Sequence, residues 1–332
     1  MQAGHYTGLR KGNKMTDKIN IRKNNEIWIP HRADPYVYRH VDGSYYFTGT
    51  LPGYNGIALR RAASLEELSR AEEVMVWEKH ASGPMGAHIW APELHYLQGK
   101  WYLYFAAGDA EDKWHIRPYV LECRGQDPIK DGWEEKGMLQ CAEEDEFSFR
   151  SFSLDATVFE HRGEHYCVWA EKTGVGKMIS NLYIARMESP IKLATVQVLL
   201  TTPDYDWERR GFWVNEGPAA LKHNGKIYLT YSASDTGANY CMGMLTLDEN
   251  KDPLDPRCWE KKRSPVLQSE EEKGIYGPGH NSFSVDEEGS PVIAFHARIQ
   301  KEIQGDPLDD PNRHAMIRKV LWKLNGEPFF RL

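Results

Sequence analysis

An internal repeat constrains the fold of this chain more than any other feature of its sequence. In each copy, a glycine precedes an aromatic-rich segment that reads as a β-strand, as in residues 100–105 after Gly99. The period is roughly 60 residues, somewhat longer than that of common propeller repeats. The glycines that mark the five copies are Gly43, Gly99, Gly163, Gly225 and Gly289. Equivalent positions in successive copies are expected to face one common axis.

Alternating apolar residues separated by turn residues predict short antiparallel strands within each copy. In the second copy, the predicted strands cover residues 93–97, 101–106 and 116–121, with a fourth near residues 133–136. Helical periodicity is nearly absent. The pattern therefore predicts an all-β fold, a five-bladed β-propeller with four antiparallel strands per blade.

Two segments depart from this pattern. A short helical turn is predicted at residues 64–68, with Ser64 as its N-cap and Glu67 three residues later. The long polar segment 301–314 contains two Asp-Pro pairs and is predicted to be a loop inserted in the last blade.

Composition and charge restrict the classes of partner. The formal net charge of -7 and the lack of a basic stripe argue against nucleic acid and membrane surfaces as partners, and they favour a neutral ligand. The five cysteines are scattered and include no C-x-x-C pair. Neither a disulfide framework nor a zinc site is predicted.

The first residues differ from the rest of the chain. Residues 1–26 are predicted to be a flexible N-terminal extension, and residues 27–332 a single propeller domain. Residues 1–24 contain several basic residues but no continuous apolar segment of the kind found in secretory signals. This predicts a cytoplasmic location, with secretion as the alternative if a native leader is missing. No segment approaches the roughly 20 apolar residues of a membrane helix.

Three acidic residues recur at one place in the repeat. Counting back about eight or nine residues from each glycine leads, in order, to Asp34, Trp90 with Ala91, Asp155, Glu216 and His280. Three carboxylates directed at one cavity repel each other, and the simplest physical answer is that one keeps its proton near neutral pH. A protonated acid beside an ionised base suits hydrolysis, and in an inverting glycosidase the two carboxyls stand roughly 6.5–9.5 Å apart.

Each acid alone also has a structural explanation. The Asp-Pro pair at Asp34 and the Glu-Gly-Pro sequence at Glu216 are typical of turns. Asp155 differs, because residues 154–159 read as the interior of a strand, where an unpaired aspartate is unfavourable. The common register of the three acids favours a functional role.

Five ordered motifs carry a resemblance to a known family. They are Arg-Ala-Asp-Pro at 32–35, His-Ile-Trp-Ala-Pro-Glu at 88–93, Ser-Leu-Asp-Ala at 153–156, Asn-Glu-Gly-Pro at 215–218 and Gly-Pro-Gly-His-Asn-Ser at 277–282. From residue 27 to residue 330 the chain resembles glycoside hydrolase family 43, whose members are five-bladed propellers that act on arabinose- and xylose-containing polysaccharides.

The resemblance implies a role for each acid. Asp34 would be the general base, Glu216 the general acid, and Asp155 the residue that orients the acid and raises its pKa. The physical account agrees, because an ionised Asp155 would penalise a second negative charge on Glu216 and hold its proton in place.

The other two positions of the register are not acidic. A tryptophan facing the cavity at Trp90 is predicted to be a sugar platform, with burial in the core as the alternative. His280 either satisfies a buried hydrogen bond or, by resemblance, helps to hold a cation on the axis. Calcium prefers oxygen ligands, so water-mediated binding is the expected form. No cofactor is predicted to be required.

Further candidates for sugar binding are weaker. Arg298 resembles a family arginine that reaches the terminal sugar, and a guanidinium can fork onto adjacent hydroxyls; the alternative is a surface ion pair. Asn181 is a candidate polar wall of the pocket. His31, Phe152 and Trp213 flank the catalytic motifs and are predicted to shape the pocket, although core packing explains each equally well.

The resemblance favours an inverting, exo-acting α-L-arabinofuranosidase that releases terminal arabinose from arabinan or arabinoxylan oligosaccharides. A β-xylosidase or an endo-arabinanase on the same fold is the alternative. A retaining fructan hydrolase is disfavoured, because its Asn-Asp-Pro-Asn and Glu-Cys motifs are absent at the required places. A non-catalytic sugar-binding propeller is a further alternative, since one fold supports many functions.

Overall fold

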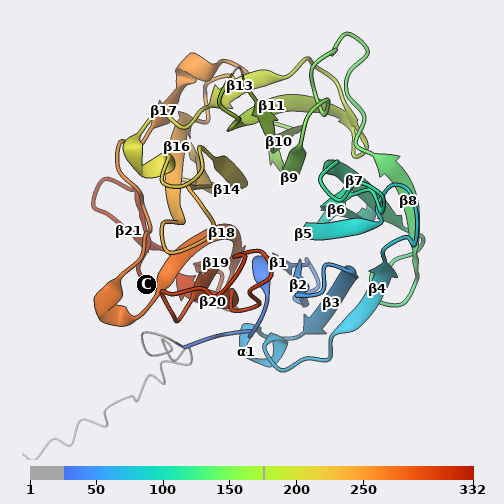
Figure 1. Cartoon of the computed structure of the whole chain (residues 1–332), viewed down its shortest axis with the longest axis horizontal. Coiled ribbons are helices and arrows are strands. Elements are labelled where there is room, and N and C mark those ends of the chain that lie inside the picture. Colours follow the sequence, from blue (N-terminus) through green and yellow to red (C-terminus); the bar gives the residue numbers. More distant parts are fainter. Residues whose placement is uncertain (1–25, 175) are drawn as a thin grey trace, which may run out of the picture.

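Five small antiparallel sheets stand in a ring around a central axis, with the first strand of each sheet nearest the axis (Figure 1). The computed structural model describes residues 26–174 and 176–332. The predicted N-terminal extension over residues 1–26 therefore lies outside the described residues, except for its last residue. The prediction of an all-β, five-bladed propeller is confirmed.

Blades one and two are four-stranded sheets in which each strand pairs with the next along the chain. The strands of blade one are β1 (Ala33–Arg39), β2 (Tyr45–Thr50), β3 (Gly56–Ala62) and β4 (Val74–Glu78). The strands of blade two are β5 (Ala87–Leu97), β6 (Lys100–Gly108), β7 (Arg117–Cys123) and β8 (Trp133–Met138). All four strands predicted for the second copy are therefore present.

The remaining blades differ in their outer strands. Blade three contains β9 (Ser153–His161), β10 (Glu164–Thr173), β11 (Ile179–Ser189) and two short strands, β12 (Lys192–Leu193) and β13 (Val198–Thr201). Blade four contains β14 (Asn215–His223), β15 (Lys226–Ala233), β16 (Cys241–Asp248) and β17 (Trp259–Lys261). Blade five contains β18 (Tyr276–Val285), β19 (Pro291–Arg298) and β20 (His314–Lys319), and a small hairpin follows, β21 (Leu321–Trp322) and β22 (Pro328–Phe329).

The N-terminal end of the described chain completes blade five. Ile29 forms an antiparallel bridge with Ala315 of β20, and the Ala315 amide donates to the Ile29 carbonyl at 2.9 Å. Ile29 therefore takes the place of a fourth strand at the outer edge of this blade. Because the beginning of the ring pairs with its last blade, the two ends of the chain hold the ring closed (Figure 1).

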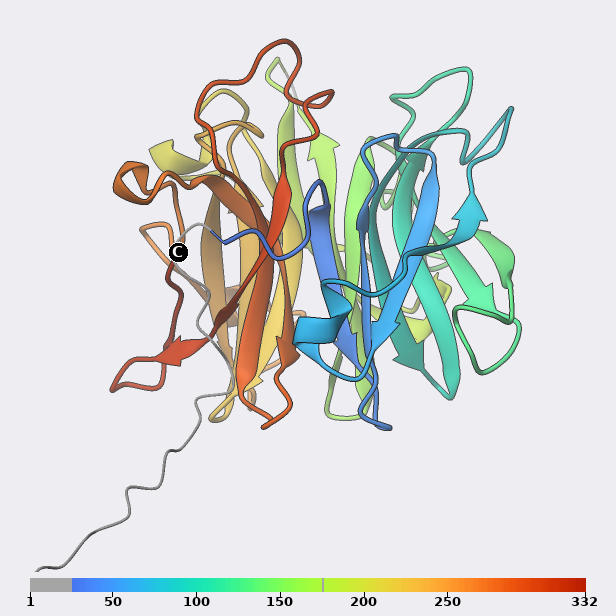
Figure 2. The ribbon, with the colours of Figure 1, turned by 90° about the horizontal axis from the view of Figure 1, so that it is seen from below.

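Helical structure is confined to short turns. They are α1 (Leu65–Leu68) and the 3-10 turns η1 (Asp206–Glu208), η2 (Pro256–Cys258) and η3 (Glu271–Lys273). Ser64 caps α1 as predicted, since its hydroxyl accepts a hydrogen bond from the Glu67 amide at 3.2 Å. The predicted loop in the last blade is also confirmed, and it rises beyond β19 and β20 at one end of the propeller (Figure 2).

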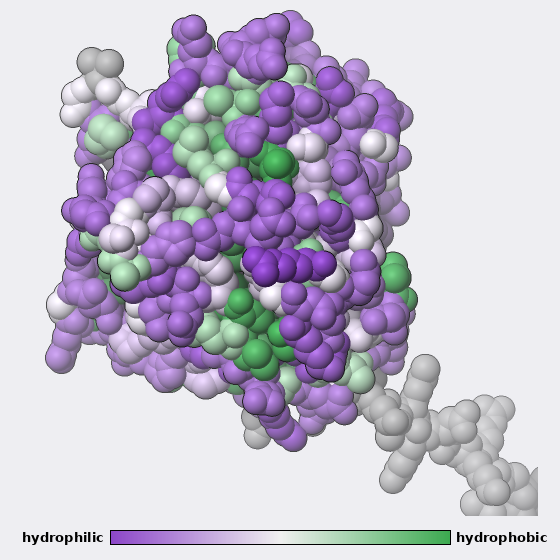
Figure 3. Space-filling view, turned by 90° about the vertical axis from the view of Figure 1, so that its right-hand side faces the viewer, coloured by the Kyte–Doolittle hydropathy of each residue, from purple (hydrophilic) through white to green (hydrophobic). Residues whose placement is uncertain are grey.

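The apolar core is divided among the blades. Five clusters of buried side chains each lie between adjacent blades, as Leu59 of blade one packs with Leu94 and Leu103 of blade two. Most of the outer face on the side of β4 and β8 is hydrophilic, with small hydrophobic patches (Figure 3). Each small sheet therefore buries its apolar side chains against the neighbouring blade, which it could not do alone. All five cysteines are free.

The glycines of the repeat lie in the hairpins between the first two strands of each blade. In blades two, three and four the turn has two residues with positive φ, as at Gln98 (50°) and Gly99 (82°), which is the type I′ geometry. In blades one and five, hydrogen bonds of 2.8 Å from His40 N to Ser44 O and from Asp286 N to Ser290 O enclose three residues. The turn is thus one residue longer in two of the blades.

Candidate active site

The innermost strand of every blade carries one β-bulge at an equivalent place. In blade one, Asp34 and Pro35 together oppose Gly49, where the pairing of β1 with β2 shifts. The first residue of each bulge has a left-handed backbone. Its φ is 52° at Asp34, 47° at Ala91, 57° at Asp155, 54° at Gly217 and 44° at His280. A bulge of this kind re-aims a side chain, and the repeated bulge brings residues distant in sequence to the axis.

The predicted register is wrong by one residue in blade four. Gly217 occupies the bulge position, and Glu216 precedes it. Likewise Ala91 occupies the position in blade two, and Trp90 precedes it. The error comes from the length of the hairpin turn. Nine residues separate the turn glycine from the bulge in blade one, where the turn has three residues, but only eight in blade four, where it has two.

Asp34 is buried among hydrogen-bond donors and positive charges. Thr50 Oγ1 donates to Asp34 Oδ2 at 2.5 Å. Asp34 Oδ1 lies 3.2 Å from His280 Nδ1, 3.3 Å from His296 Nδ1 and 3.9 Å from a guanidinium nitrogen of Arg313. Burial raises the pKa of Asp34, but the charge of His280, reinforced by the charge of Arg313, lowers it well below its ordinary value. The carboxylate is therefore ionised near neutral pH and can accept a proton.

Asp155 and Glu216 form a second group in which a proton is retained. Asp155 Oδ2 accepts a hydrogen bond from the Gly217 amide at 2.9 Å. Burial, opposed by the charge of His280 and reinforced by the other two carboxylates, raises the pKa of Asp155 to about 8. Burial also raises the pKa of Glu216, although the hydrogen bond from Tyr240 opposes it. Near neutral pH the pair therefore holds a proton that Asp34 does not.

His280 connects the two groups. Its Nδ1 lies 3.2 Å from Asp34 Oδ1 and 3.8 Å from Asp155 Oδ2, and its amide donates to Ser232 Oγ at 2.6 Å. Burial lowers the pKa of His280, but the charges of Asp34 and Asp155 outweigh it and raise the pKa overall. Among the described residues, no group of three or more His, Cys, Asp or Glu side chains is arranged to hold a metal ion.

Five residues outside the predicted set act on the acids, four by direct contact and Lys172 through its charge. They are Thr50, Lys172, Tyr240, His296 and Arg313. One of them was within reach of sequence reasoning, because strand alternation places His296 on the same face as Arg298. The His296 Nδ1 accepts a hydrogen bond from the Asp34 amide at 3.1 Å. Burial lowers the pKa of His296 to about 4, so this ring is neutral near pH 7.

Trp90 belongs to an aromatic group beside the bulge of blade two. The His88 ring stacks on Trp90 with centroids 4.3 Å apart, and the Tyr54 ring meets Trp90 edge-on at 5.6 Å. Trp114 contacts the His88 ring at 4.9 Å and is 47% exposed. Trp90 itself is partly buried and packs against the core. Trp90 therefore packs against the core and also belongs to a partly exposed aromatic group. Its role as a sugar platform stays a prediction.

Arg298 and His31 hold the loop between β19 and β20. Arg298 is buried, not on the surface, and donates to Asp310 Oδ1 at 2.6 Å and to the Pro307 carbonyl at 3.1 Å. His31 is exposed, and its Nδ1 lies 3.0 Å from the Pro311 carbonyl. The same loop, which includes Arg313, lines a small pocket that Ala33 and Thr50 also border, and none of the three acids is among the residues that line it. Both predicted residues therefore position this loop beside Asp34.

Three further candidates lie in blades three and four. Lys172 Nζ lies 3.7 Å from the centre of the Phe152 ring. Burial lowers the pKa of Lys172, and the charge of Glu216 partly opposes this shift. Lys172 and the Phe152 ring therefore lie on the side of the general acid candidate. Trp213 is partly buried beneath the Arg209 guanidinium, 4.9 Å from the ring centre.

Asn181 is buried on β11, the third strand of its blade. Its amide donates to Thr173 Oγ1 at 3.1 Å and to the Tyr183 hydroxyl at 3.3 Å. These contacts lie within blade three and include none of the three acids. Its role as a polar wall of the pocket stays a prediction.

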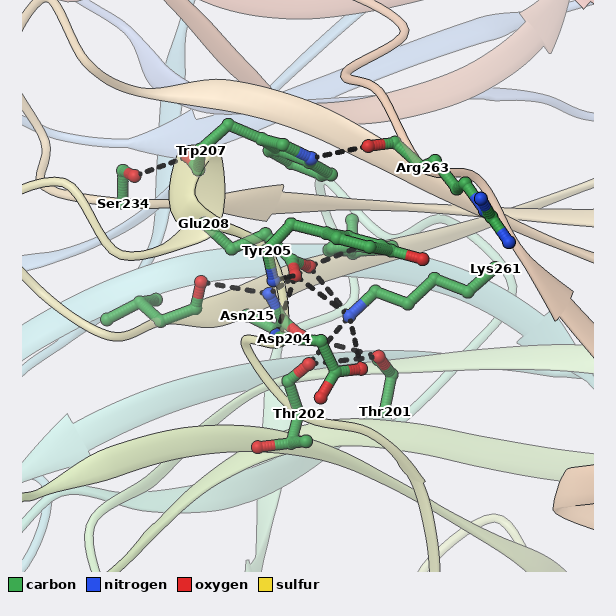
Figure 4. A network of polar contacts seen from close by, with 12 residues as sticks. Thr201, Thr202, Asp204, Tyr205, Trp207, Glu208, Asn215, Ser234, Lys261 and Arg263 are labelled. Carbon is green, nitrogen blue, oxygen red and sulfur yellow. Dashed lines mark hydrogen bonds and ion pairs between the residues drawn. The ribbon is translucent and has the colours of Figure 1, made fainter.

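A buried polar network holds the start of β14, immediately before Glu216 (Figure 4). The Glu208 carboxylate is fully buried and accepts a hydrogen bond from Asn215 Nδ2 at 3.0 Å and one from Lys261 Nζ at 2.9 Å. The Ser180 hydroxyl also donates to the Asn215 carbonyl at 3.2 Å. The backbone that carries Glu216 is therefore fixed by partners from η1, β17 and β11.

The comparisons with known proteins agree with this geometry. The model of the family Glycosyl hydrolases family 43 matches residues 24–328. The chain belongs to this family. Among solved structures, this family 43 chain is similar to the α-L-arabinofuranosidase from Lactobacillus brevis, with a TM-score of 0.86 and 48% identity over 92% of this chain and 95% of that one.

Two bacterial relatives have the name extracellular exo-α-(1→5)-L-arabinofuranosidase. The enzyme from Streptomyces chartreusis is 51% identical over 84% of this family 43 chain and 84% of its own. The enzyme from Streptomyces avermitilis is 47% identical over 90% of this chain, which spans 61% of that enzyme's length.

These names contradict the predicted cytoplasmic location and point to secretion. The prediction was wrong because it rested only on the absence of an apolar segment in residues 1–24, which does not determine the compartment. No helix in residues 26–174 or 176–332 has the length and apolarity to cross a membrane.

Proposed function

We propose that the chain is an inverting, exo-acting α-L-arabinofuranosidase that releases terminal arabinose from arabinan or arabinoxylan oligosaccharides. The observation that carries the proposal is the separation of charge at the axis, where Asp34 is ionised and the Asp155–Glu216 pair retains a proton. The names of the relatives support arabinose as the sugar, and two of them support an α-1,5 linkage.

Each acid has one task in the proposed reaction. Glu216 gives its proton to the leaving oxygen as the glycosidic bond breaks, and Asp34 takes a proton from the water that attacks the opposite face of the sugar. The water's hydroxyl ends on arabinose and the Glu216 proton ends on the leaving oxygen, while the proton that Asp34 takes from the water passes to solvent and Glu216 is reprotonated from solvent before the next turnover. Asp155 accepts a hydrogen bond from the Gly217 amide next to the acid. The two carboxyl groups share one proton, and we assign it to Glu216 in the reacting complex, where a negative charge on Asp155 favours the protonated form of Glu216.

The loop between β19 and β20 supports exo action. It is fixed by Arg298 and His31, and it lines the pocket beside Asp34 together with Tyr54. Arg313, at the end of this loop, lies 3.9 Å from Asp34 Oδ1, so we infer that the loop also bounds the space in front of Asp34, which suits a single terminal sugar better than a continuous chain. A water-mediated calcium ion near His280 stays a prediction.

Two measurements test the reaction. Release of nitrophenol from nitrophenyl α-L-arabinofuranoside should greatly exceed release from the xylopyranoside, and the reverse preference would indicate a β-xylosidase. The anomer of the fresh product, followed by NMR, should have the configuration opposite to that of the substrate. Retention of configuration would contradict the roles given to Asp34 and Glu216.

Two substitutions test the acids against a non-catalytic sugar-binding propeller. Asp34→Asn and Glu216→Gln remove a charge or an acidic proton with little change of shape. Both are expected to abolish turnover while arabinose binding persists, as measured by calorimetry. Unchanged hydrolysis in either variant would refute the catalytic assignment.

A further inference from the structure

Tyr240 touches the general acid candidate directly, although no sequence motif singled it out. It lies immediately before β16, and its hydroxyl donates to Glu216 Oε1 at 2.7 Å. The side chain is 1% exposed. A buried hydroxyl aimed at one oxygen of a carboxyl group restricts the orientation of that group.

The protein is built closely around the Tyr240 ring. A Cβ on Gly279 would lie 2.4 Å from Tyr240 Cε1, so no residue other than glycine leaves room for the ring. The ring also stacks on that of His296, with centroids 5.4 Å apart and planes at 9°. The Tyr240 amide also donates to the Gly237 carbonyl at 3.1 Å. The glycine at 279 in the Gly-Pro-Gly-His motif is thereby explained by the space that the tyrosine needs.

We propose that Tyr240 is a positioning residue for the general acid: it fixes the carboxyl group of Glu216 through Oε1 and leaves Oε2 to carry the proton to the leaving oxygen. The inference rests on the proposed function, because it requires Glu216 to be the acid. No bond is made or broken at Tyr240. Its hydroxyl stays a donor, since burial and the charge of Glu216 raise the pKa of the tyrosine well above its ordinary value.

Removal of this hydroxyl has a predictable sign. The charged or titratable groups that face Glu216 are Asp34 on β1, Asp155 on β9, Lys172 on β10, His280 on β18 and Tyr240 itself. Of these, Tyr240 makes the largest contribution that lowers the pKa of the acid. Without it, burial is opposed less and the pKa of Glu216 rises further.

The test is Tyr240→Phe, which removes one oxygen and keeps the ring packed against Gly279 and His296. Without its anchor the carboxyl group turns more freely, so kcat is expected to fall by about tenfold, equivalent to about one ordinary hydrogen bond. The basic limb of the kcat/KM profile against pH should move to higher pH. The loss should be smaller for dinitrophenyl arabinofuranoside than for arabinobiose, because a good leaving group needs little help from an acid.

Tyr231→Phe is the matched control. Tyr231 is also a fully buried tyrosine of blade four, but its hydroxyl donates to Glu208 Oε1 at 2.8 Å. This control should lower the melting temperature without moving the basic limb or changing the ratio between the two substrates. The substrate ratio is measured within one variant, so it does not depend on the fraction of protein that is folded.

The outcomes separate the two proposals. If Glu216→Gln is inactive while Tyr240→Phe keeps the kcat, the pH profile and the substrate ratio of the original protein, the inference about Tyr240 is wrong and the proposed function stands. If Tyr231→Phe changes the basic limb and the substrate ratio as much as Tyr240→Phe does, the role of Tyr240 is structural and the inference is again wrong. If Glu216→Gln remains fully active, the proposed function itself fails.

Discussion

Removal of the Lys261 charge tests whether the network before Glu216 contributes as much stability as its burial implies. Lys261 Nζ lies 2.9 Å from the Glu208 carboxylate and also donates to the Thr202 carbonyl at 2.6 Å. Lys261→Met keeps most of the aliphatic chain and removes the ammonium group. The Glu208 carboxylate then remains in the interior without its cation.

The structure sets the expected magnitude. Removal of one partner of a buried ion pair costs about 3–5 kcal/mol. Glu208 is 0% exposed, but the Lys261 side chain is 13% exposed, which reduces the desolvation of the pair. The carboxylate also keeps its other donors, the amides of Asp204 and Tyr205 (2.8 Å each), Asn215 Nδ2 (3.0 Å) and the Tyr231 hydroxyl (2.8 Å). We therefore expect the lower end of the range, about 3 kcal/mol.

Equilibrium unfolding in urea, followed by tryptophan fluorescence, measures this free energy. Lys222→Met is the control, because Lys222 pairs with Glu160 at 3.3 Å on the surface, where both side chains are at least 41% exposed. The control should leave the midpoint unchanged within error, since exposed pairs contribute little. If Lys261→Met lost less than about 1 kcal/mol, the reasoning from burial would be refuted. We also expect a lower kcat for Lys261→Met, because Asn215 adjoins Glu216.

Three other predictions concern the axis and its loop. The pKa of His296 is lowered to about 4, so between pH 6.5 and 4 the unfolded chain binds a proton that the folded chain lacks, and stability falls as pH falls through this range. In urea unfolding at a series of pH values, His296→Gln should remove up to about 3 kcal/mol of this loss, and an unchanged slope would contradict a buried neutral ring. Gly279→Ala should cost about 1–3 kcal/mol by overpacking against Tyr240, measured by the same unfolding assay, and full stability would show that the ring has room to move. Asp310→Asn removes the charged partner of buried Arg298, so limited proteolysis between β19 and β20 should become faster and KM should rise; unchanged cleavage would show that the ion pair does not hold the loop.

The repeat made the fold predictable, because turn glycines and alternating apolar residues report local geometry. The strands of blade two were recovered for this reason, as was the helical turn capped by Ser64. The register at the axis was not fully predictable, since it depends on whether a hairpin encloses two residues or three. The difference between Gly99 and Gly43 is visible only in the backbone hydrogen bonds around each turn.

The three acids were predicted from motifs, but most of their partners were not. Thr50 reaches Asp34 from the end of β2, Tyr240 reaches Glu216 from the residue before β16, and Arg313 approaches Asp34 from the end of a long loop. None of these places has a periodic signal, because Tyr240 and Arg313 lie in loops and the Thr50 contact, within blade one, depends on the bulge that re-aims Asp34. Only His296 could have been inferred from the alternation of its strand.

In blade four the acid does not occupy the bulge position, which shows how five equivalent bulges can carry different functional groups. Three of the bulge positions carry an aspartate or a histidine, residue types that tolerate a left-handed backbone better than most. In blade four a side chain at that position would crowd His280, since a Cβ on Gly217 would lie 3.0 Å from the imidazole Cγ. Glycine removes this crowding, and its amide then donates to Asp155 at 2.9 Å. Because the bulge position is taken by this backbone donor, the acid must stand one residue earlier, where Tyr240 can reach it.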